Sequence, residues 1–207
     1  PYARVTDPDK RSQLRRERYS AIGRLGEVAR QQGASFVVVA GDLFDTHQPT
    51  RADVSAACSA IGAVGLPVLA IPGNHDHGGA GSCWQEGYFR QEAEQLAPNL
   101  TVLLEREPFE LSKLGLPGGV LLPCPLLRKA EPVDPTAWLR QLDFSPWSDQ
   151  PRIVLAHGSV HGFGGEDTSD TDDENPPVPT NRIDLTALPV GEIDYVALGD
   201  WHGLKQV

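Results

Sequence analysis

The sequence has few cysteines, and none of them forms a CxxC motif. The three cysteines, Cys58, Cys83 and Cys124, are odd in number and irregularly spaced. A disulfide framework usually needs an even number of cysteines, whereas isolated thiols are typical of reducing compartments. We therefore expect a cytoplasmic protein with reduced thiols, whose fold does not depend on disulfides.

Long apolar runs are also missing from the chain. No stretch approaches the roughly 18 consecutive apolar residues that a membrane span needs. The first thirty residues are basic and lack the apolar segment of a signal peptide. These absences predict a protein with no membrane span and no secretion signal.

Basic residues are outnumbered by acidic ones. The 207 residues include 18 Lys and Arg against 28 Asp and Glu, which gives a formal net charge of −10. This balance argues against a generally basic nucleic-acid binder. The acidic residues are unevenly placed, because residues 166–174 alone contain six of them and no basic residue. We expect the acidic, Pro-rich segment Gly164–Thr180, which contains them, to be a mobile surface loop.

One basic segment stands out against this background, the helix expected over Lys10–Gln32. It contains seven basic and two acidic residues, and its apolar side is expected to consist of Leu14, Ile22, Leu25 and Ala29. The excess of positive charge has two interpretations. It is either an ordinary solvated helix surface or a surface that contacts a phosphate backbone.

Four short apolar runs are each followed within three residues by Asp, Asn or His. They are Phe36–Ala40 before GDLFD, Pro67–Ile71 before PGNHDH, Arg152–Ala156 before HGSVHG, and Asp194–Leu198 before GDWHG. Such runs are typical of strands buried on both faces of a sheet. Helical segments alternate with the strands, which predicts an α/β fold with a mostly parallel sheet in a single domain over residues 1–207. Ligands bind beyond the carboxyl ends of such strands, so the polar residues there predict a site.

The polar residues at these strand ends form a set of oxygen and nitrogen donors without sulfur. The candidate metal ligands are Asp42, Asn74, His157, Asp200 and His202. Such a set suits Mn²⁺, Fe or Zn²⁺ rather than a metal that prefers thiolates. Because a carboxylate has two oxygens, Asp42 could bridge two ions, as in two-metal phosphoryl transfer.

The motifs GDLFD, GNHD, HG and GDWH, in this order and each after a strand, resemble the calcineurin-like metallophosphoesterase superfamily. Within it they are most similar to the SbcD-type DNA-repair exonuclease branch. The resemblance covers Ala40 to Gly203 and implies a layered sheet core flanked by helices. It also implies hydrolysis of phosphodiesters at a site with two divalent ions, most often Mn²⁺, with Fe or Zn²⁺ as alternatives.

The resemblance assigns roles to individual residues. Asp42 would bridge both ions, Asn74 and His157 would bind the second ion, and His202 would bind the first. His75 would be the general acid that protonates the leaving oxygen, and Asp45 would orient it. Apart from the resemblance, we expect the remaining histidines to lie at the substrate rim or in loops; they are His47, His77 and His161.

Two departures from the family pattern bear on these roles. The family begins with a strand that ends in Asp-x-His, and no such strand precedes Arg4. The last family motif is Gly-His-x-His, whereas this chain has Asp200 in place of the first histidine. Asp200 would either bind the second ion directly or hold a neighbouring histidine. We expect the domain to be incomplete at both ends, without the first strand and the C-terminal strands of the fold.

Three functions remain open at this point. The first is a DNA exonuclease or repair nuclease, which the basic helix favours and which could act with a partner ATPase subunit or as a homodimer. The second is a phosphodiesterase or phosphatase for small molecules, which the negative net charge favours. The third is a degenerate domain that binds nucleic acid or a partner without catalysis.

Overall fold

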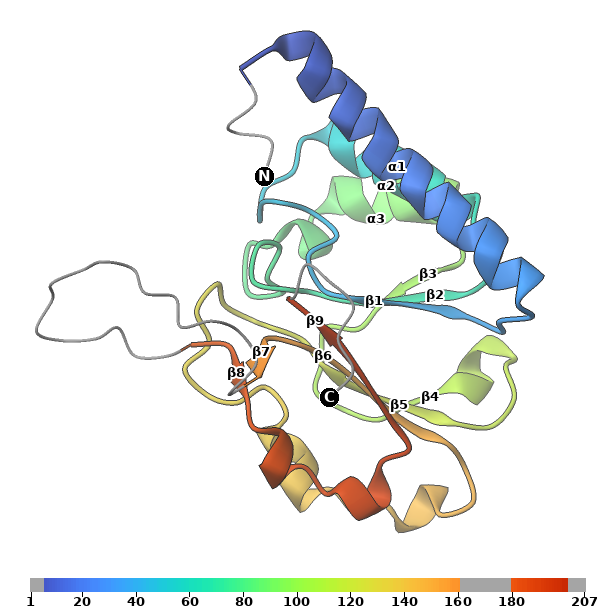
Figure 1. Ribbon diagram of the computed structural model, residues 1–207, viewed down its shortest axis with the longest axis vertical. Helices are drawn as coiled ribbons and strands as arrows, with labels where there is room; N and C mark the ends of the chain where they lie inside the picture. The colour runs from blue at the N-terminus through green and yellow to red at the C-terminus, as the bar shows by residue number, and fades with distance from the viewer. Residues whose placement is uncertain (1–5, 161–179, 201–207) are drawn as a thin grey trace, which may run out of the picture.

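The computed structural model describes residues 6–160 and 180–200, and these form four layers. Two β-sheets lie face to face in the middle, and helices cover the outer face of each sheet (Figure 1). The prediction of an α/β fold with helices flanking a layered sheet core is confirmed.

The first sheet is parallel and consists of β1 (Val37–Ala40), β2 (Val68–Ile71) and β3 (Leu100–Val102), in that order. Its outer face is covered by α1 (Pro8–Gln31), α2 (Arg51–Gly62) and α3 (Gly87–Leu96) (Figure 1). Side-chain caps mark where α1 and α2 begin. Asp7 caps α1, and Thr50 and Asp53 form a reciprocal capping box at the start of α2.

The second sheet consists of β4 (Phe109–Glu110), β5 (Val120–Cys124), β6 (Arg152–His157) and β9 (Tyr195–Gly199), in that order. Strand β4 pairs with β5 in antiparallel fashion, and the other neighbours are parallel. Strands β7 (Ser159–Val160) and β8 (Arg182–Ile183) form a separate parallel pair. The short 3₁₀ helices are η2 (Cys83–Gln85), η3 (Leu111–Leu114), η4 (Ala137–Gln141), η5 (Ser145–Trp147), η6 (Leu185–Ala187) and η7 (Val190–Glu192).

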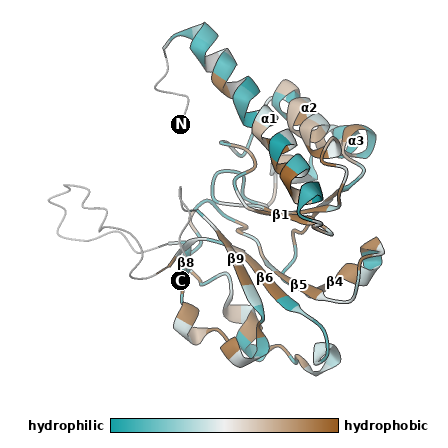
Figure 2. Cartoon of the chain, turned by 45° about the vertical axis from the view of Figure 1, so that its right-hand side comes forward, coloured by the Kyte–Doolittle hydropathy of each residue, from teal (hydrophilic) through white to brown (hydrophobic). Residues whose placement is uncertain are grey.

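The core between the sheets is made by alternate residues of the strands. Leu69 and Ile71 of β2 face Leu121 of β5 and Leu155 of β6, and all four are completely buried. Their neighbours along the strands pack outward against the helices, so the strands are apolar on both faces (Figure 2). A slip of one residue would exchange these faces, so burial fixes the register that positions the strand ends.

Helix α1 packs differently from the sequence-based expectation. Ile22 packs on the core together with Tyr19, but Leu25 is 64% exposed. The reason is Gly26, which is buried and lies so close to Val64 that a Cβ atom would meet the Val64 Cα at 2.9 Å. Helix α1 therefore approaches the chain after α2 most closely at Gly26, and the neighbouring Leu25 points outward. None of the helices in the described part of the chain combines the length and hydrophobicity that a membrane span needs.

Candidate metal centre

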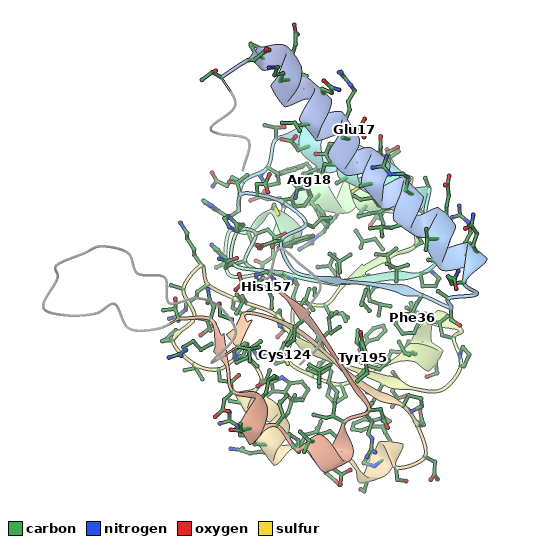
Figure 3. The ribbon with its side chains drawn as sticks, in the orientation of Figure 1. Glu17, Arg18, Phe36, Cys124, His157 and Tyr195 are labelled. Atoms are coloured by element: carbon green, nitrogen blue, oxygen red, sulfur yellow. The ribbon has the colours of Figure 1, made fainter. Side chains whose placement is uncertain are left out.

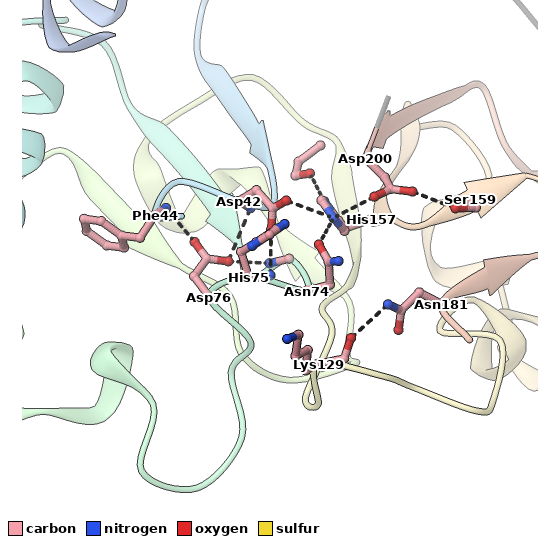
Figure 4. A network of polar contacts seen from close by, with 12 residues as sticks. Asp42, Phe44, Asn74, His75, Asp76, Lys129, His157, Ser159, Asn181 and Asp200 are labelled. Atoms are coloured by element: carbon pink, nitrogen blue, oxygen red, sulfur yellow. Dashed lines mark hydrogen bonds and ion pairs between the residues drawn. The ribbon is translucent and has the colours of Figure 1, made fainter. Parts of the chain in front are cut away.

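The carboxyl ends of four strands from both sheets meet at one point (Figure 4). Asp42 follows β1, Asn74 follows β2, His157 is the last residue of β6, and Asp200 follows β9 directly. The structure thus brings together four of the five predicted metal ligands. The fifth, His202, lies outside the described residues.

The side chains of these four residues converge on one nitrogen, Nε2 of His157. Asn74 Oδ1 lies 3.2 Å from it, and the nearest oxygens of Asp42 and Asp200 lie 3.6 Å and 3.7 Å away. The other ring nitrogen, Nδ1, lies 2.7 Å from the backbone carbonyl oxygen of Ala40. A carbonyl oxygen can only accept, so Nδ1 carries the hydrogen, and in the neutral ring Nε2 presents a lone pair.

This geometry has the chemistry of a cation site. A lone pair on Nε2 and three oxygens that have no hydrogen to donate repel one another at these distances. A positive charge among them, a metal ion or a proton on the ring, makes the arrangement favourable. Within residues 6–160 and 180–200, no group of three or more His, Cys, Asp or Glu side chains is by itself arranged to hold a metal ion. Among the three oxygens, the amide oxygen of Asn74 lies nearest to Nε2.

Two glycines make this close approach possible. A Cβ atom on Gly73 would lie 2.2 Å from Asp42 Oδ1, and one on Gly41 would lie 2.2 Å from His157 Nδ1. Gly41 also has a positive φ of 85°, a backbone angle that residues other than glycine rarely adopt. The glycines of the GD and GN motifs are therefore needed to seat the donor groups.

Both carboxylates at the site have unusual backbone conformations. Asp42 has a φ of 55° and Asp200 a φ of 104°, although neither is a glycine. Each is also held by a hydrogen bond. The His75 amide donates to Asp42 Oδ1 at 3.0 Å, and the Ser159 hydroxyl donates to Asp200 Oδ2 at 2.7 Å. Strained residues that are held this firmly are typical of functional sites.

Asp76 is a further residue at the site, and none of the sequence-based predictions assigns it a role. Its carboxylate is fully buried and accepts hydrogen bonds from the amides of Gly73 (2.7 Å), Asp42 (3.3 Å) and Phe44 (3.0 Å). Burial raises the pKa of Asp76 to about 6, although the amides of Phe44 and Gly73 act in the opposite direction. Asp76 thus connects the two loops that carry Asp42 and Asn74.

The predicted catalytic pair is not in contact in the described structure. His75 is exposed, whereas Asp45 forms an ion pair with Arg18, with 2.6 Å between Nη1 and Oδ2. No contact between Asp45 and His75 occurs among the described residues. The orienting role of Asp45 therefore stays a prediction.

Two of the predicted rim histidines lie against each other. The rings of His47 and His77 are stacked, with centroids 5.6 Å apart and planes 11° apart. Burial lowers the pKa of His77, and His47 lowers it further. His77 Nδ1 is buried and has no hydrogen-bond partner among the described residues. The third rim candidate, His161, lies outside them.

A comparison with known protein families matches most of the chain. Residues 15–204 match the calcineurin-like phosphoesterase family, whose members generally use two divalent metal ions. No curated protein sequence matches the chain. Among solved structures, the chain is similar to TT1561 of Thermus thermophilus, with 16% identity and a TM-score of 0.46 over 70% of this chain. The match spans 64% of the length of that solved chain. This chain belongs to the calcineurin-like phosphoesterase family.

Proposed function

We propose that this chain is a metal-dependent phosphodiesterase of the SbcD-type branch and that its substrate is DNA. The observation that carries the proposal is the convergence of Asn74, Asp42 and Asp200 on Nε2 of His157. Family membership supports the reaction class, because calcineurin-like phosphoesterases hydrolyse phosphoesters with bound metal.

The donor set favours a hard divalent cation. Two carboxylates and an amide oxygen outnumber the one imidazole, which suits Mn²⁺, and Fe or Zn²⁺ are the alternatives. Asp42, Asn74, His157 and Asp200 would hold the ions, with His202 as a further ligand. Bound divalent ions supply Lewis-acid stabilisation of the charge that develops on a phosphoryl group.

His75 is the proposed general acid for the leaving group. The backbone amide of His75 donates a hydrogen bond to Asp42 Oδ1, and the residue is exposed. Its imidazole is therefore accessible to solvent next to the donor set (Figure 4). In this position the ring can donate a proton to the departing oxygen. The hydrogen bond from its amide keeps the backbone of His75 beside Asp42.

Basic side chains near the site support a polyanionic substrate. Arg128 and Lys129 are exposed on a loop that is hydrogen-bonded to the GNHDHG loop, through the Gly78 amide and the Leu126 carbonyl (2.8 Å). Figure 4 shows Lys129 on the same side of the site as Asn74 and His75. On α1, Lys10 and Arg16 are also exposed. Such groups bind phosphates without regard to sequence.

The negative net charge favours the second candidate, a phosphodiesterase for small molecules. The two are separated by assays with Mn²⁺ on bis-p-nitrophenyl phosphate, end-labelled linear DNA and circular DNA, with EDTA as the control. A DNA exonuclease should cleave the small diester, degrade linear DNA from its ends and leave circular DNA intact. Cleavage of the small diester alone would favour the second candidate, and metal binding without any cleavage would indicate a degenerate binding domain.

Partners and location follow from the same proposal. An SbcD-type nuclease would act with an ATPase subunit, and a homodimer is the alternative assembly. All three cysteines are free and buried, in keeping with a cytoplasmic protein. Size measurement of the purified chain, alone and mixed with a candidate ATPase, tests the assembly.

A further inference from the structure

Arg18 connects the middle of α1 to the GDLFD loop of the metal centre (Figure 3). Its Nη1 donates to Asp45 Oδ2 at 2.6 Å. Its Nη2 donates to the carbonyl oxygen of Leu43 at 2.7 Å and lies 3.4 Å from that of Asp42. The Arg18 side chain is 28% exposed, compared with 61% for Arg24 on the same helix.

These contacts complete the support of the loop. Asp76 accepts from the amides of Asp42 and Phe44, and Arg18 donates to the carbonyls of Asp42 and Leu43. The N–H groups of the loop backbone are therefore held by Asp76, and its carbonyl groups are held by Arg18. This matters because Asp42 has a φ of 55°, a conformation that a residue with a side chain keeps only when its surroundings enforce it.

We propose that Arg18 is a positioning residue that holds Asp42 in the conformation needed for metal binding, with Asp45 as its counter-ion. The inference rests on the proposed function of the site. Arginine is suited to this task because its planar guanidinium offers several donors in a fixed fork. Lysine would keep the charge but could not reproduce contacts with a carboxylate and two carbonyls at once.

Arg18 also belongs to the basic residues of α1, so a direct contact with a DNA phosphate is the competing role. The structure argues against that role, because both terminal nitrogens of Arg18 already have partners and its charge is paired with Asp45. The two roles differ in their kinetic consequences. A positioning residue changes kcat for every substrate, whereas a phosphate contact changes KM for DNA and its salt dependence.

The test compares Arg18→Lys and Arg18→Ala with Arg24→Ala, whose arginine forms only an exposed 3.6 Å pair with Glu17. Mn²⁺ affinity is measured by titration calorimetry, and kcat and KM are measured on bis-p-nitrophenyl phosphate and on DNA. Both Arg18 variants should bind Mn²⁺ about 10- to 100-fold more weakly. At saturating Mn²⁺, kcat should fall on both substrates while KM for DNA stays unchanged, and Arg24→Ala should match the wild type. A rise in KM confined to DNA, with normal Mn²⁺ affinity, would overturn the proposal.

A second readout does not depend on activity. In the metal-free chain, hydrogen exchange at the Phe44 amide reports whether the loop is held, because that amide donates to Asp76. Arg18→Ala should speed this exchange, with α2 unchanged as an internal reference, and Arg24→Ala should leave it unaltered. Unchanged Phe44 exchange in Arg18→Ala would refute the positioning role even if the chain hydrolysed nothing. Absence of hydrolysis in the wild type, with faster exchange in the variant, would instead refute the proposed function alone.

Discussion

The carboxylate of Asp76 accepts a hydrogen bond from the backbone amide of Phe44, 3.0 Å away and 32 positions earlier in the chain. The same carboxylate accepts from Gly73 in its own loop. A buried side chain thus joins the loop after β1 to the loop after β2. The positions of Asp42 and Asn74 relative to each other depend on this connection.

The first prediction concerns pH. The pKa of Asp76 is raised to about 6 in the folded chain, from an ordinary value of 3.8 in the unfolded chain. The native state therefore holds this proton more tightly. Its contribution to stability is fully present below pH 4 and is lost as pH rises through about 6, by up to about 3 kcal/mol.

This pH dependence can be measured by urea unfolding of the metal-free chain between pH 4 and pH 7. Since other groups also titrate, the informative quantity is the difference in unfolding free energy between wild type and Asp76→Asn. That difference should change across this range in favour of the variant as pH rises. A constant difference would contradict the raised pKa.

The second prediction concerns metal binding. Asp42→Asn should abolish tight binding of divalent ions, because the change removes the negative charge of the proposed bridging ligand. Titration calorimetry with Mn²⁺ measures the loss. Asp149→Asn is the matched control, since Asp149 is exposed. Tight Mn²⁺ binding by Asp42→Asn would exclude the bridging role.

The third prediction separates chemistry from binding at His75. If its imidazole protonates the leaving oxygen, His75→Ala should lower kcat by roughly 10²–10⁴-fold with little change in KM. Mn²⁺ affinity should be retained, because the contact with Asp42 is made by the backbone amide. A variant that loses its metal, or keeps its full kcat, would show that His75 is not the acid.

The role of Asp45 can be determined by combining two substitutions. If Asp45 orients His75, adding Asp45→Asn to His75→Ala should lower kcat little further, because the effects of residues that act as a unit are not additive. If Asp45 is instead the counter-ion of Arg18, the single change Asp45→Asn should weaken Mn²⁺ binding.

The fourth prediction uses the packing of Gly73. A Cβ atom there would lie 2.2 Å from Asp42 Oδ1 and 2.8 Å from His157 Cε1, so Gly73→Ala must displace these two candidate metal ligands. We expect a loss of stability of about 1–3 kcal/mol and weaker Mn²⁺ binding. Gly23→Ala, on α1 with nothing within 4 Å of the new methyl group, should be neutral or stabilising by about 0.5–1 kcal/mol. Equal effects of the two changes in thermal unfolding would contradict the steric argument.

Local sequence patterns predicted the parts of the site that lie at strand ends. Asp42, Asn74 and His157 each lie within three residues of the end of an apolar run, so the fold had to bring them to the edge of a sheet. The division of the strands between two sheets was not predictable in the same way. A strand that is apolar on both faces shows that it is buried, but not which neighbour it pairs with.

Contacts between distant segments account for what the sequence did not reveal. Arg18 looks like one of several charges on a helix, and only the tertiary structure places it against the GDLFD loop, 24 to 27 positions away. Leu25 follows the helical period of a buried face, yet a close approach at Gly26 leaves it exposed. Periodicity describes one element, whereas these outcomes depend on how two elements meet.

The donor groups come in equal number from the two sheets, Asp42 and Asn74 from one and His157 and Asp200 from the other. An ion held by all four would act as a reversible cross-link between the two halves of the sandwich. Binding would therefore oppose separation of the sheets, and unfolding would have to release the ion. The stabilisation should grow with free ion concentration as RT ln(1 + [L]/Kd), so the melting temperature would report occupancy of the site.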